Sequence, residues 1–410
     1  MQFTLNGLSA LHILRTLRSR ANSKQINRRC QFIEPNSSPA KRWTTKALRG
    51  QLEPYGSVAE FSEKQPLHVL TSDKKSRLQV RGTNNTFRLG SYPNKAFIQL
   101  ENGLAISGPE LMFIELARVM DPAIHLLLGM ELCGRFSRSA DDPRNGTITY
   151  DIEPVTNVNR LRAFATEASW IRGTKQALET IERIVENAWS PMEAILAALI
   201  VTPVYNLGYG LDPIVLNPRK QLSERMSRSS SVDSRVPDIM FEKTNIGINY
   251  DGDDHFRLHD IATAAVYADR HPGDSAAIRQ LDDTLRETRR RIVDDKHRDR
   301  DLMSMGLTVF PVTREDLEEP GGCDRLMSQV IEVMESTADR DLSLQKQMLL
   351  HPSIAKARQD FIWSIMPGNK SLNARKRLEA ITAASPSVND FSITYEVDEL
   401  GRQSISISEL

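Results

Sequence analysis

Cysteine is scarce in this chain of 410 residues, which contains only Cys30, Cys133 and Cys323. Three scattered cysteines are too few for a disulfide framework or for a cysteine-rich zinc cluster. The composition therefore indicates a reducing, intracellular compartment, and we expect a cytoplasmic protein.

Long apolar runs are also missing. The most apolar stretch, residues 194–201, is too short to span a bilayer and is soon followed by Pro203. The first 33 residues carry six Lys and Arg and no acid, as a transit peptide does, but Leu8, Leu11 and Leu14 have the spacing of a helix that packs on a domain. We favour the packed helix and expect no contact with a membrane.

The chain has no net charge, because 53 Lys and Arg balance 53 Asp and Glu. The charges are unevenly distributed: residues 1–100 hold 17 Lys and Arg against five Asp and Glu. A basic front permits contact with nucleic acid. With 40% apolar and 26% charged residues, the composition is that of a globular protein with a core, and it excludes a disordered or collagen-like chain.

Composition and turn signals divide the chain into four parts. Residues 1–150 read as a small, basic α+β region, with short strand-like segments between 67 and 106 and a predicted capping box at Ser107–Glu110. Residues 151–185 read as a helical linker, and residues 186–320 as an α/β domain. Residues 321–410 read as a helical extension that ends in a β-hairpin, because residues 391–397 and 404–408 alternate in polarity.

The segment from Val236 to Asp251 carries the clearest chemical pattern. It reads as two strands joined by a turn at residues 242–245. With a period of two, Asp238 lies opposite the apolar face of the first strand, and Asn249 and Asp251 lie opposite the apolar face of the second. A hairpin can therefore bring the three side chains together, and His255 follows closely. Oxygen ligands from two strands beside an imidazole suit a hard divalent cation and an activated water.

A long helix and a strand follow this hairpin. Apolar residues recur at helical spacing from Ile278 to Leu302, with Asp295 and Arg298 on the same stripe, and Gly306 is a natural stop. Residues 307–313 read as a strand, and Pro311 places it at a sheet edge. The order of helix, hairpin, helix and strand predicts an α/β core with a mixed sheet flanked by helices.

These motifs, taken in order, resemble a known family. Ser190-Pro191-x-Glu193 is followed by Val236-Pro237-Asp238, then by Gly247-Ile248-x-Tyr250-Asp251-Gly252-x-x-His255, and then by Asp295-x-x-Arg298-x-x-x-Leu302-x-x-x-Gly306-x-x-Val309. The series resembles the Vsr-like branch of the PD-(D/E)XK endonuclease superfamily, found in bacterial proteins. Residues 68–133 resemble the middle of AbiEi-type antitoxins. The resemblance covers about residues 65–317 and implies a restriction-endonuclease-like fold for residues 186–320.

The resemblance also implies a role for each motif residue. Asp238 would be the first metal-binding acid, Asn249 stands where relatives have glutamate, and Asp251 stands in the place of the superfamily's lysine. His255 would lie near the scissile phosphate, and Glu193 would be the acid of the preceding helix. Asp295 and Arg298 would be a supporting pair. Asp238, Asp251, His255 and Glu193 are thus the predicted catalytic residues. Asp238, Asn249 and Asp251 are the predicted ligands of Mg²⁺, for which Mn²⁺ could substitute.

Each residue also has a simpler interpretation. Glu193 lies in a capping box and could serve only its own helix, and Asp251 could belong to a solvated turn. Asp295 and Arg298 have the spacing of a helix-surface ion pair. His125, within an apolar helix, reads as a core histidine.

Three functions follow from these interpretations. The first is a DNA endonuclease that uses a divalent metal for phosphodiester hydrolysis. The second is a non-catalytic DNA-binding regulator, or an antitoxin-like protein, with a decayed nuclease fold, because an amide at Asn249 replaces an expected acid. The third is an interaction module without nucleic acid. DNA is the expected partner, and the antitoxin-like N-terminal region makes a toxin or another protein a second expected partner.

Overall fold

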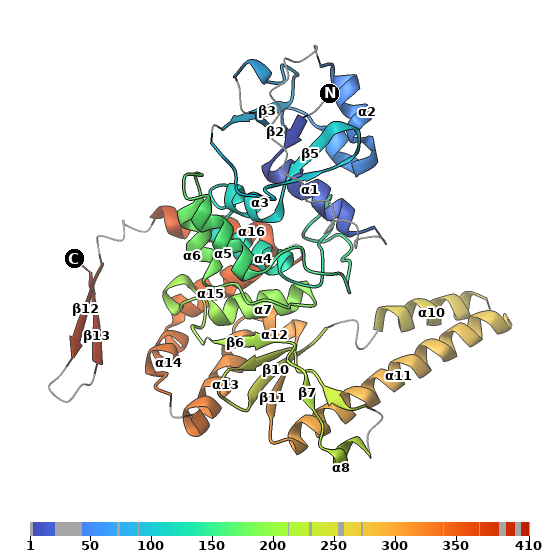
Figure 1. The fold of residues 1–410 in the computed structure, drawn as a ribbon. Helices are drawn as coiled ribbons and strands as arrows, with labels where there is room; N and C mark the ends of the chain where they lie inside the picture. Colours follow the sequence, from blue (N-terminus) through green and yellow to red (C-terminus); the bar gives the residue numbers. More distant parts are fainter. Residues whose placement is uncertain are drawn as a thin grey trace.

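Two mixed β-sheets flanked by helices make up the computed structural model of the chain (Figure 1). The structure describes residues 3–20, 43–71, 74–88, 90–211, 213–228, 232–252, 258–271, 274–338, 340–368, 370–384, 391–397 and 403–409. The mixed α/β class is the one that the sequence predicts. Within the described residues, no helix combines the length and the apolar character that a membrane crossing requires.

The first sheet has five strands in the order β3-β2-β1-β5-β4. These strands are β1 (Phe3–Leu5), β2 (Leu67–Thr71), β3 (Thr83–Phe87), β4 (Phe97–Gln99) and β5 (Leu104–Ser107). β1 is central: it pairs with β2 in antiparallel and with β5 in parallel orientation. β3 is parallel to β2, and β4 is antiparallel to β5.

Helices pack beside this sheet and continue the chain below it. They are α1 (Gly7–Arg18), α2 (Thr45–Leu52), α3 (Pro109–Leu116), α4 (Pro122–Leu132), α5 (Val158–Glu167) and α6 (Thr174–Ile181). Asp121 is the N-cap of α4, and its side chain accepts hydrogen bonds from the backbone N–H groups of Ala123 and Ile124. The predicted capping box at Ser107 is wrong: the N-cap of α3 is Gly108, and no side chain caps it.

α7 (Pro191–Val201) lies between the two halves of the molecule (Figure 1). Ser190 is its N-cap and Pro191 occupies its first turn, a favourable start for a helix. Nearly all its side chains are buried, since it contacts α4 on one side and strand β6 (Ile214–Leu216) on the other. This position explains the apolar run at residues 194–201.

The second sheet has four strands in the order β11-β10-β9-β6. β9 (Ile239–Phe241) and β10 (Ile246–Asp251) form the predicted hairpin, with Ile239 opposite Ile248 in the core. β11 (Thr308–Thr313) runs parallel to β10 at the sheet edge, as Pro311 predicts. β6, which pairs antiparallel with β9, was not expected from the sequence.

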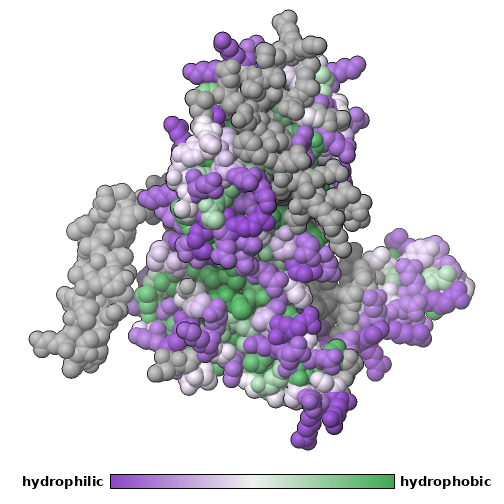
Figure 2. All heavy atoms as spheres, in the orientation of Figure 1, coloured by the Kyte–Doolittle hydropathy of each residue, from purple (hydrophilic) through white to green (hydrophobic). Residues whose placement is uncertain are grey.

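An arm of two helices leaves this sheet between β10 and β11 (Figure 1). It consists of α10 (Leu258–Arg270) and α11 (Ser275–Ser304), which contact each other. Its surface is mostly hydrophilic in Figure 2. The C-terminal part of α11 lies against the sheet, where Arg298 pairs with Asp251 of β10 and Leu302 is buried.

The remaining elements are small strands and a C-terminal helical extension. They are β7 (Lys220–Gln221), α8 (Glu224–Ser227), β8 (Ser234–Arg235), α12 (Arg314–Glu318), α13 (Gly322–Ala338), α14 (Ser343–Leu350), α15 (Pro352–Ile365), α16 (Lys370–Ala384), β12 (Phe391–Val397) and β13 (Gln403–Glu409). β12 and β13 pair as the predicted antiparallel hairpin. One cluster of buried apolar residues extends from Phe3 to Met366, so both sheets share a core.

Candidate active site

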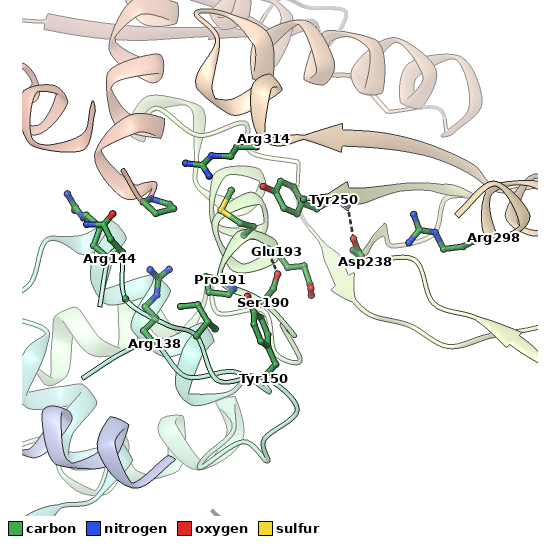
Figure 3. Close-up of a pocket in the computed structure, with 16 residues that line it drawn as sticks. Arg138, Arg144, Tyr150, Ser190, Pro191, Glu193, Asp238, Tyr250, Arg298 and Arg314 are labelled. Atoms are coloured by element: carbon green, nitrogen blue, oxygen red, sulfur yellow. Dashed lines mark hydrogen bonds between the residues drawn. The ribbon is translucent and has the colours of Figure 1, made fainter. Parts of the chain in front are cut away.

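The start of α7, the start of β9 and the end of β10 meet at one pocket of about 510 Å³ (Figure 3). Glu193 and Asp238 line this pocket, and Arg138, Arg144, Arg298 and Arg314 line it too. Tyr150 and Tyr250 add aromatic surface. The site therefore joins two acidic side chains to four arginines.

Asp238 is held by hydrogen bonds to two residues of β10 and to the residue that follows β6. The Tyr250 backbone N–H donates to Asp238 Oδ2 at 2.7 Å, and the Asp238 backbone N–H donates to Asn249 Oδ1 at 3.1 Å. The Asp238 carbonyl accepts from the backbone N–H of Asn217, directly after β6. These contacts fix the carboxylate at the pocket and leave it little rotational freedom.

Burial raises the pKa of Asp238 to about 7, and the negative charge of Glu193 adds to this shift. The hydrogen bond from Tyr250 and the charge of Arg298 act in the opposite direction. A cation that enters the site of such an acid stabilises its charged form, so the site favours binding of a cation.

Glu193 is 8% exposed and has two kinds of contact. Its backbone N–H donates to Ser190 Oγ at 3.2 Å, while its Oε2 accepts from the Trp189 backbone N–H at 2.9 Å and from Asn217 Nδ2 at 2.7 Å. Burial raises the pKa of Glu193, and these hydrogen bonds offset part of the rise. Glu193 thus supports the start of α7 and also presents a buried carboxylate to the pocket.

Asn249 and Asp251 are both engaged with protein partners. Asn249 is 2% exposed, and its Oδ1 accepts the Asp238 backbone N–H. Its Nδ2 is buried without a hydrogen-bond partner among the described residues. Arg298 Nη2 donates to Asp251 Oδ1 at 3.0 Å, so the Asp251 charge is neutralised.

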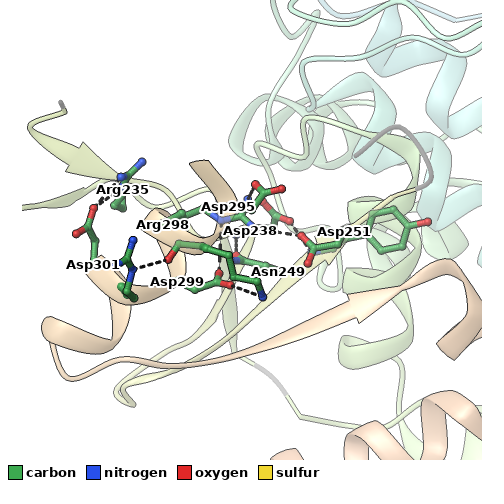
Figure 4. A network of polar contacts seen from close by, with 11 residues as sticks. Arg235, Asp238, Asn249, Asp251, Asp295, Arg298, Asp299 and Asp301 are labelled. Atoms are coloured by element: carbon green, nitrogen blue, oxygen red, sulfur yellow. Dashed lines mark hydrogen bonds and ion pairs between the residues drawn. The ribbon is translucent and has the colours of Figure 1, made fainter. Parts of the chain in front are cut away.

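Arg298 is the centre of a polar network at the base of α11 (Figure 4). Besides Asp251, it lies 3.7 Å from Asp295 Oδ1 and 3.9 Å from Asp299 Oδ1. Its side chain is 18% exposed and lines the pocket. Arg298 therefore lies at the site itself, and Asp295 lies behind it.

The structure brings together six of the seven residues that the sequence predicts for the site. Glu193, Asp238 and Arg298 line the pocket, and Asn249, Asp251 and Asp295 hold them from behind. The seventh, His255, lies outside the described residues. His125, interpreted as a core histidine, is 1% exposed, and burial lowers its pKa to about 4.

Three arginines of the pocket and Asn217 were missed. Arg138 and Arg144 lie in the loop of residues 134–150, far in sequence from every motif, and nothing in their spacing points to the site. Arg314 follows β11 directly and is the first residue of α12, after its N-cap Thr313. Asn217, with a positive φ of 51°, ends β6, a strand too short for a periodic signal.

The fold resemblance implies Mg²⁺, so the donor set can be tested for it. No group of three or more His, Cys, Asp or Glu in the described parts of the chain is arranged to hold a metal ion. The predicted set of Asp238, Asn249 and Asp251 is divided, because the single side-chain oxygen of Asn249 accepts the Asp238 N–H and Asp251 is paired with the cation Arg298. The hydrogen bonds to the carboxylates of Asp238 and Glu193 come from neutral donors. The Asp238–Glu193 pair does fit, since Mg²⁺ is commonly held by one or two carboxylates with waters and substrate phosphate.

Comparison of the chain with protein-family models, with curated proteins and with solved structures finds no match.

Proposed function

We propose that this chain hydrolyses phosphodiester bonds in DNA with the help of a divalent metal ion. The observation that carries the proposal is the pair of buried carboxylates, Glu193 and Asp238, in a pocket that four arginines also line. Two buried carboxylates of raised pKa, one of which raises the pKa of the other, attract a metal cation, and arginines bind phosphate. The two groups together are what a metal-assisted attack on a phosphodiester requires.

The order of elements supports the same function. α7, β6, β9, β10, α11 and β11 follow in sequence as a helix, three antiparallel strands, a helix and a parallel strand. Apart from β6, this is the order of helix, hairpin, helix and strand that the sequence predicts. Glu193 lies in the first turn of α7, and Asp238 directly precedes β9.

The chain's own residues have separable parts in this chemistry. Asp238 and Glu193 would hold Mg²⁺, which when bound polarises the phosphate and lowers the pKa of a coordinated water. Arg298, fixed by Asp251, is placed to stabilise negative charge that develops on the phosphate. The buried hydrogen bonds to Asp238 preorganise its carboxylate before substrate arrives.

A calorimetric titration with Mg²⁺ tests the proposal, with plasmid incubation in parallel. Asp238→Asn is the sharp variant, because an amide oxygen can still accept the Tyr250 N–H while the charge is removed. We expect wild-type protein to bind Mg²⁺ and nick the plasmid and Asp238→Asn to do neither. Glu319→Gln removes an exposed acid outside the pocket and serves as the matched control. Equal binding and equal nicking in wild type and Asp238→Asn would overturn the assignment.

One observation favours a second function, a DNA-binding regulator without catalysis. Asn249 supplies no charge where relatives have an acid, and Asp251 is neutralised by Arg298. Among the residues that the structure describes, Glu193 and Asp238 are then the two acids that line the pocket. A protein that binds DNA with a salt-dependent affinity, and that neither binds Mg²⁺ nor cuts, would support this function.

Asn249→Glu distinguishes the two functions. We expect the new carboxylate to destabilise the protein in EDTA, since position 249 is buried, and to increase the affinity for Mg²⁺. Asn249→Leu is the control, because it removes the acceptor for the Asp238 N–H without adding a ligand. Unchanged Mg²⁺ affinity in Asn249→Glu would place residue 249 outside the metal site.

A further inference from the structure

The wall of the pocket opposite Asp238 comes from the N-terminal half of the chain. Arg138 and Arg144, in the loop between α4 and α5, lie across the pocket from Asp238 and Arg298 (Figure 3). In the sequence this loop belongs to the predicted α+β region of residues 1–150. Its position suggests that the loop has a part in the site.

Arg138 is a cation with an unused donor. Its Nη1 donates to the Pro143 carbonyl at 3.2 Å, which holds the guanidinium group, and its backbone N–H donates to Glu131 Oε1 at 3.1 Å. Its Nη2 is buried and has no hydrogen-bond partner within the part of the chain that the structure describes. Burial lowers the pKa of Arg138, and the charges of Arg15 and Arg144 lower it further against the attraction of Glu131.

Arg144 is fixed by the C-terminal helices. Its Nη2 donates to the Ser364 carbonyl at 3.1 Å, and its Nη1 donates to Ser371 Oγ on α16. The neighbouring Asn145 Oδ1 accepts the Gly368 N–H at 2.8 Å. Burial lowers the pKa of Arg144, and the charge of Arg375 lowers it further.

Two fixed guanidinium groups that repel each other in one pocket are poised for an anion. An anion between them would accept the unused Arg138 N–H and relieve the repulsion that lowers the pKa of Arg138. Because both side chains are held by backbone and hydroxyl oxygens, little side-chain entropy remains to be lost on binding. A phosphate offers the several acceptor oxygens that such a pair can bind.

We propose that Arg138 and Arg144 bind a phosphate of the polynucleotide backbone next to the one at Asp238 and Glu193. The inference rests on the proposed function, because it adds a second phosphate site to the same pocket. The loop of residues 134–150 and the α15–α16 pair thereby complete a substrate site whose acids come from α7 and β9.

Binding of a short, fluorescein-labelled single-stranded oligodeoxynucleotide in EDTA tests this site without metal or catalysis. We expect Arg138→Gln and Arg144→Gln each to weaken binding about tenfold and to reduce the slope of log K against log salt by about one. Arg144→Lys, which keeps the charge, should lie between wild type and Arg144→Gln. Inorganic phosphate should compete with the oligonucleotide in wild type and less so in the glutamine variants.

Arg325→Gln is the matched control, because Arg325 is 63% exposed, pairs with an exposed acid and lies outside the pocket. Thermal unfolding of each variant shows whether it is folded. Affinity and salt slope equal to the control in folded Arg138→Gln and Arg144→Gln would overturn the inference. Asp238→Asn should bind the oligonucleotide at least as tightly as wild type. The arginine site therefore stands or falls separately from metal-dependent cleavage.

Discussion

Asp238 is a buried acid whose ionisation opposes folding. Its pKa in the folded chain is about 7, against 3.8 for the free side chain. Between these two pH values the folded state binds more protons than the unfolded state, so the free energy of unfolding falls as pH rises. Below pH 3.8 both states are protonated, and above pH 7 the loss is complete.

Asp238→Asn should therefore be more stable than wild type at pH ~8, by on the order of 4 kcal/mol, with the difference shrinking toward pH ~4. Urea unfolding in EDTA across this range measures the effect. Glu193, whose pKa is also raised, leaves a smaller slope in the variant, and Glu193→Gln in the same background should reduce it further. Parallel pH profiles for wild type and Asp238→Asn would contradict the shift.

At the residue scale, the sequence predicted the side chains that share one hairpin. Asp238, Asn249 and Asp251 were found because a period of two and one turn fix their faces. The loop residues Arg138 and Arg144 obey no period, and their approach to the site depends on how α4, α15 and α16 pack. Local rules could not reveal them.

At the element scale, Gly247 allows β9 and β10 to pair closely because it has no side chain. A Cβ at this position would lie 2.7 Å from the Ile239 carbonyl oxygen and 2.5 Å from Met240 Sδ. The Met240 side chain can move away, but the strand backbone cannot move without disturbing the pairing that positions Asp238.

We expect Gly247→Ala to lower the free energy of unfolding by about 1–3 kcal/mol and to weaken any Mg²⁺ binding at Asp238. Urea unfolding and calorimetry check the two effects. Gly50 is the control, since it lies in α2 with open space around it, and Gly50→Ala should be neutral or stabilise by about 0.5–1 kcal/mol. Equal effects of the two substitutions would show that the β9–β10 contact is loose.

Elements with strong local signals were predicted and weak ones were missed. α4, α11 and the β9–β10 hairpin have caps, periodicity or turn residues of their own. β1 and β6 have three residues each and exist only because other strands pair with them. β9 is equally short, but the turn that joins it to the longer β10 reveals it, whereas the pairing of β1 and β6 depends on strands distant in the sequence.

At the scale of the whole molecule, the two sheets are linked more closely than the sequence suggests. The predicted boundary near residue 150 follows a change in composition. In the structure the Arg135 backbone N–H donates to the Ala188 carbonyl at 2.8 Å across this boundary. The shared apolar cluster and the contact of α4 with α7 lead us to expect one cooperative unfolding transition.

Glu131 on α4 connects the first sheet's helices to the pocket. Its carboxylate accepts from Arg15 Nε at 3.0 Å and Nη2 at 2.6 Å and from the Arg138 backbone N–H at 3.1 Å. Burial alone would raise its pKa, but Arg15 outweighs this effect and holds the pKa of Glu131 at about 2. The stability from this pair is thus present above pH 4.5 and lost as pH falls toward 2.

Glu131→Gln leaves the Arg15 charge buried without its partner, so we expect a loss of about 3–5 kcal/mol at neutral pH. The amide oxygen of the variant can still accept the Arg138 backbone N–H, so oligonucleotide affinity in the folded variant should not fall. Glu63→Gln is the matched control: Glu63 makes the same two-pronged contact with Arg81 at the surface, where its removal should change stability little.

Calorimetric unfolding of Glu131→Gln decides between two outcomes. A single transition that moves as a whole shows that both sheets unfold together, whereas two transitions of which one moves would show that the N-terminal half folds by itself.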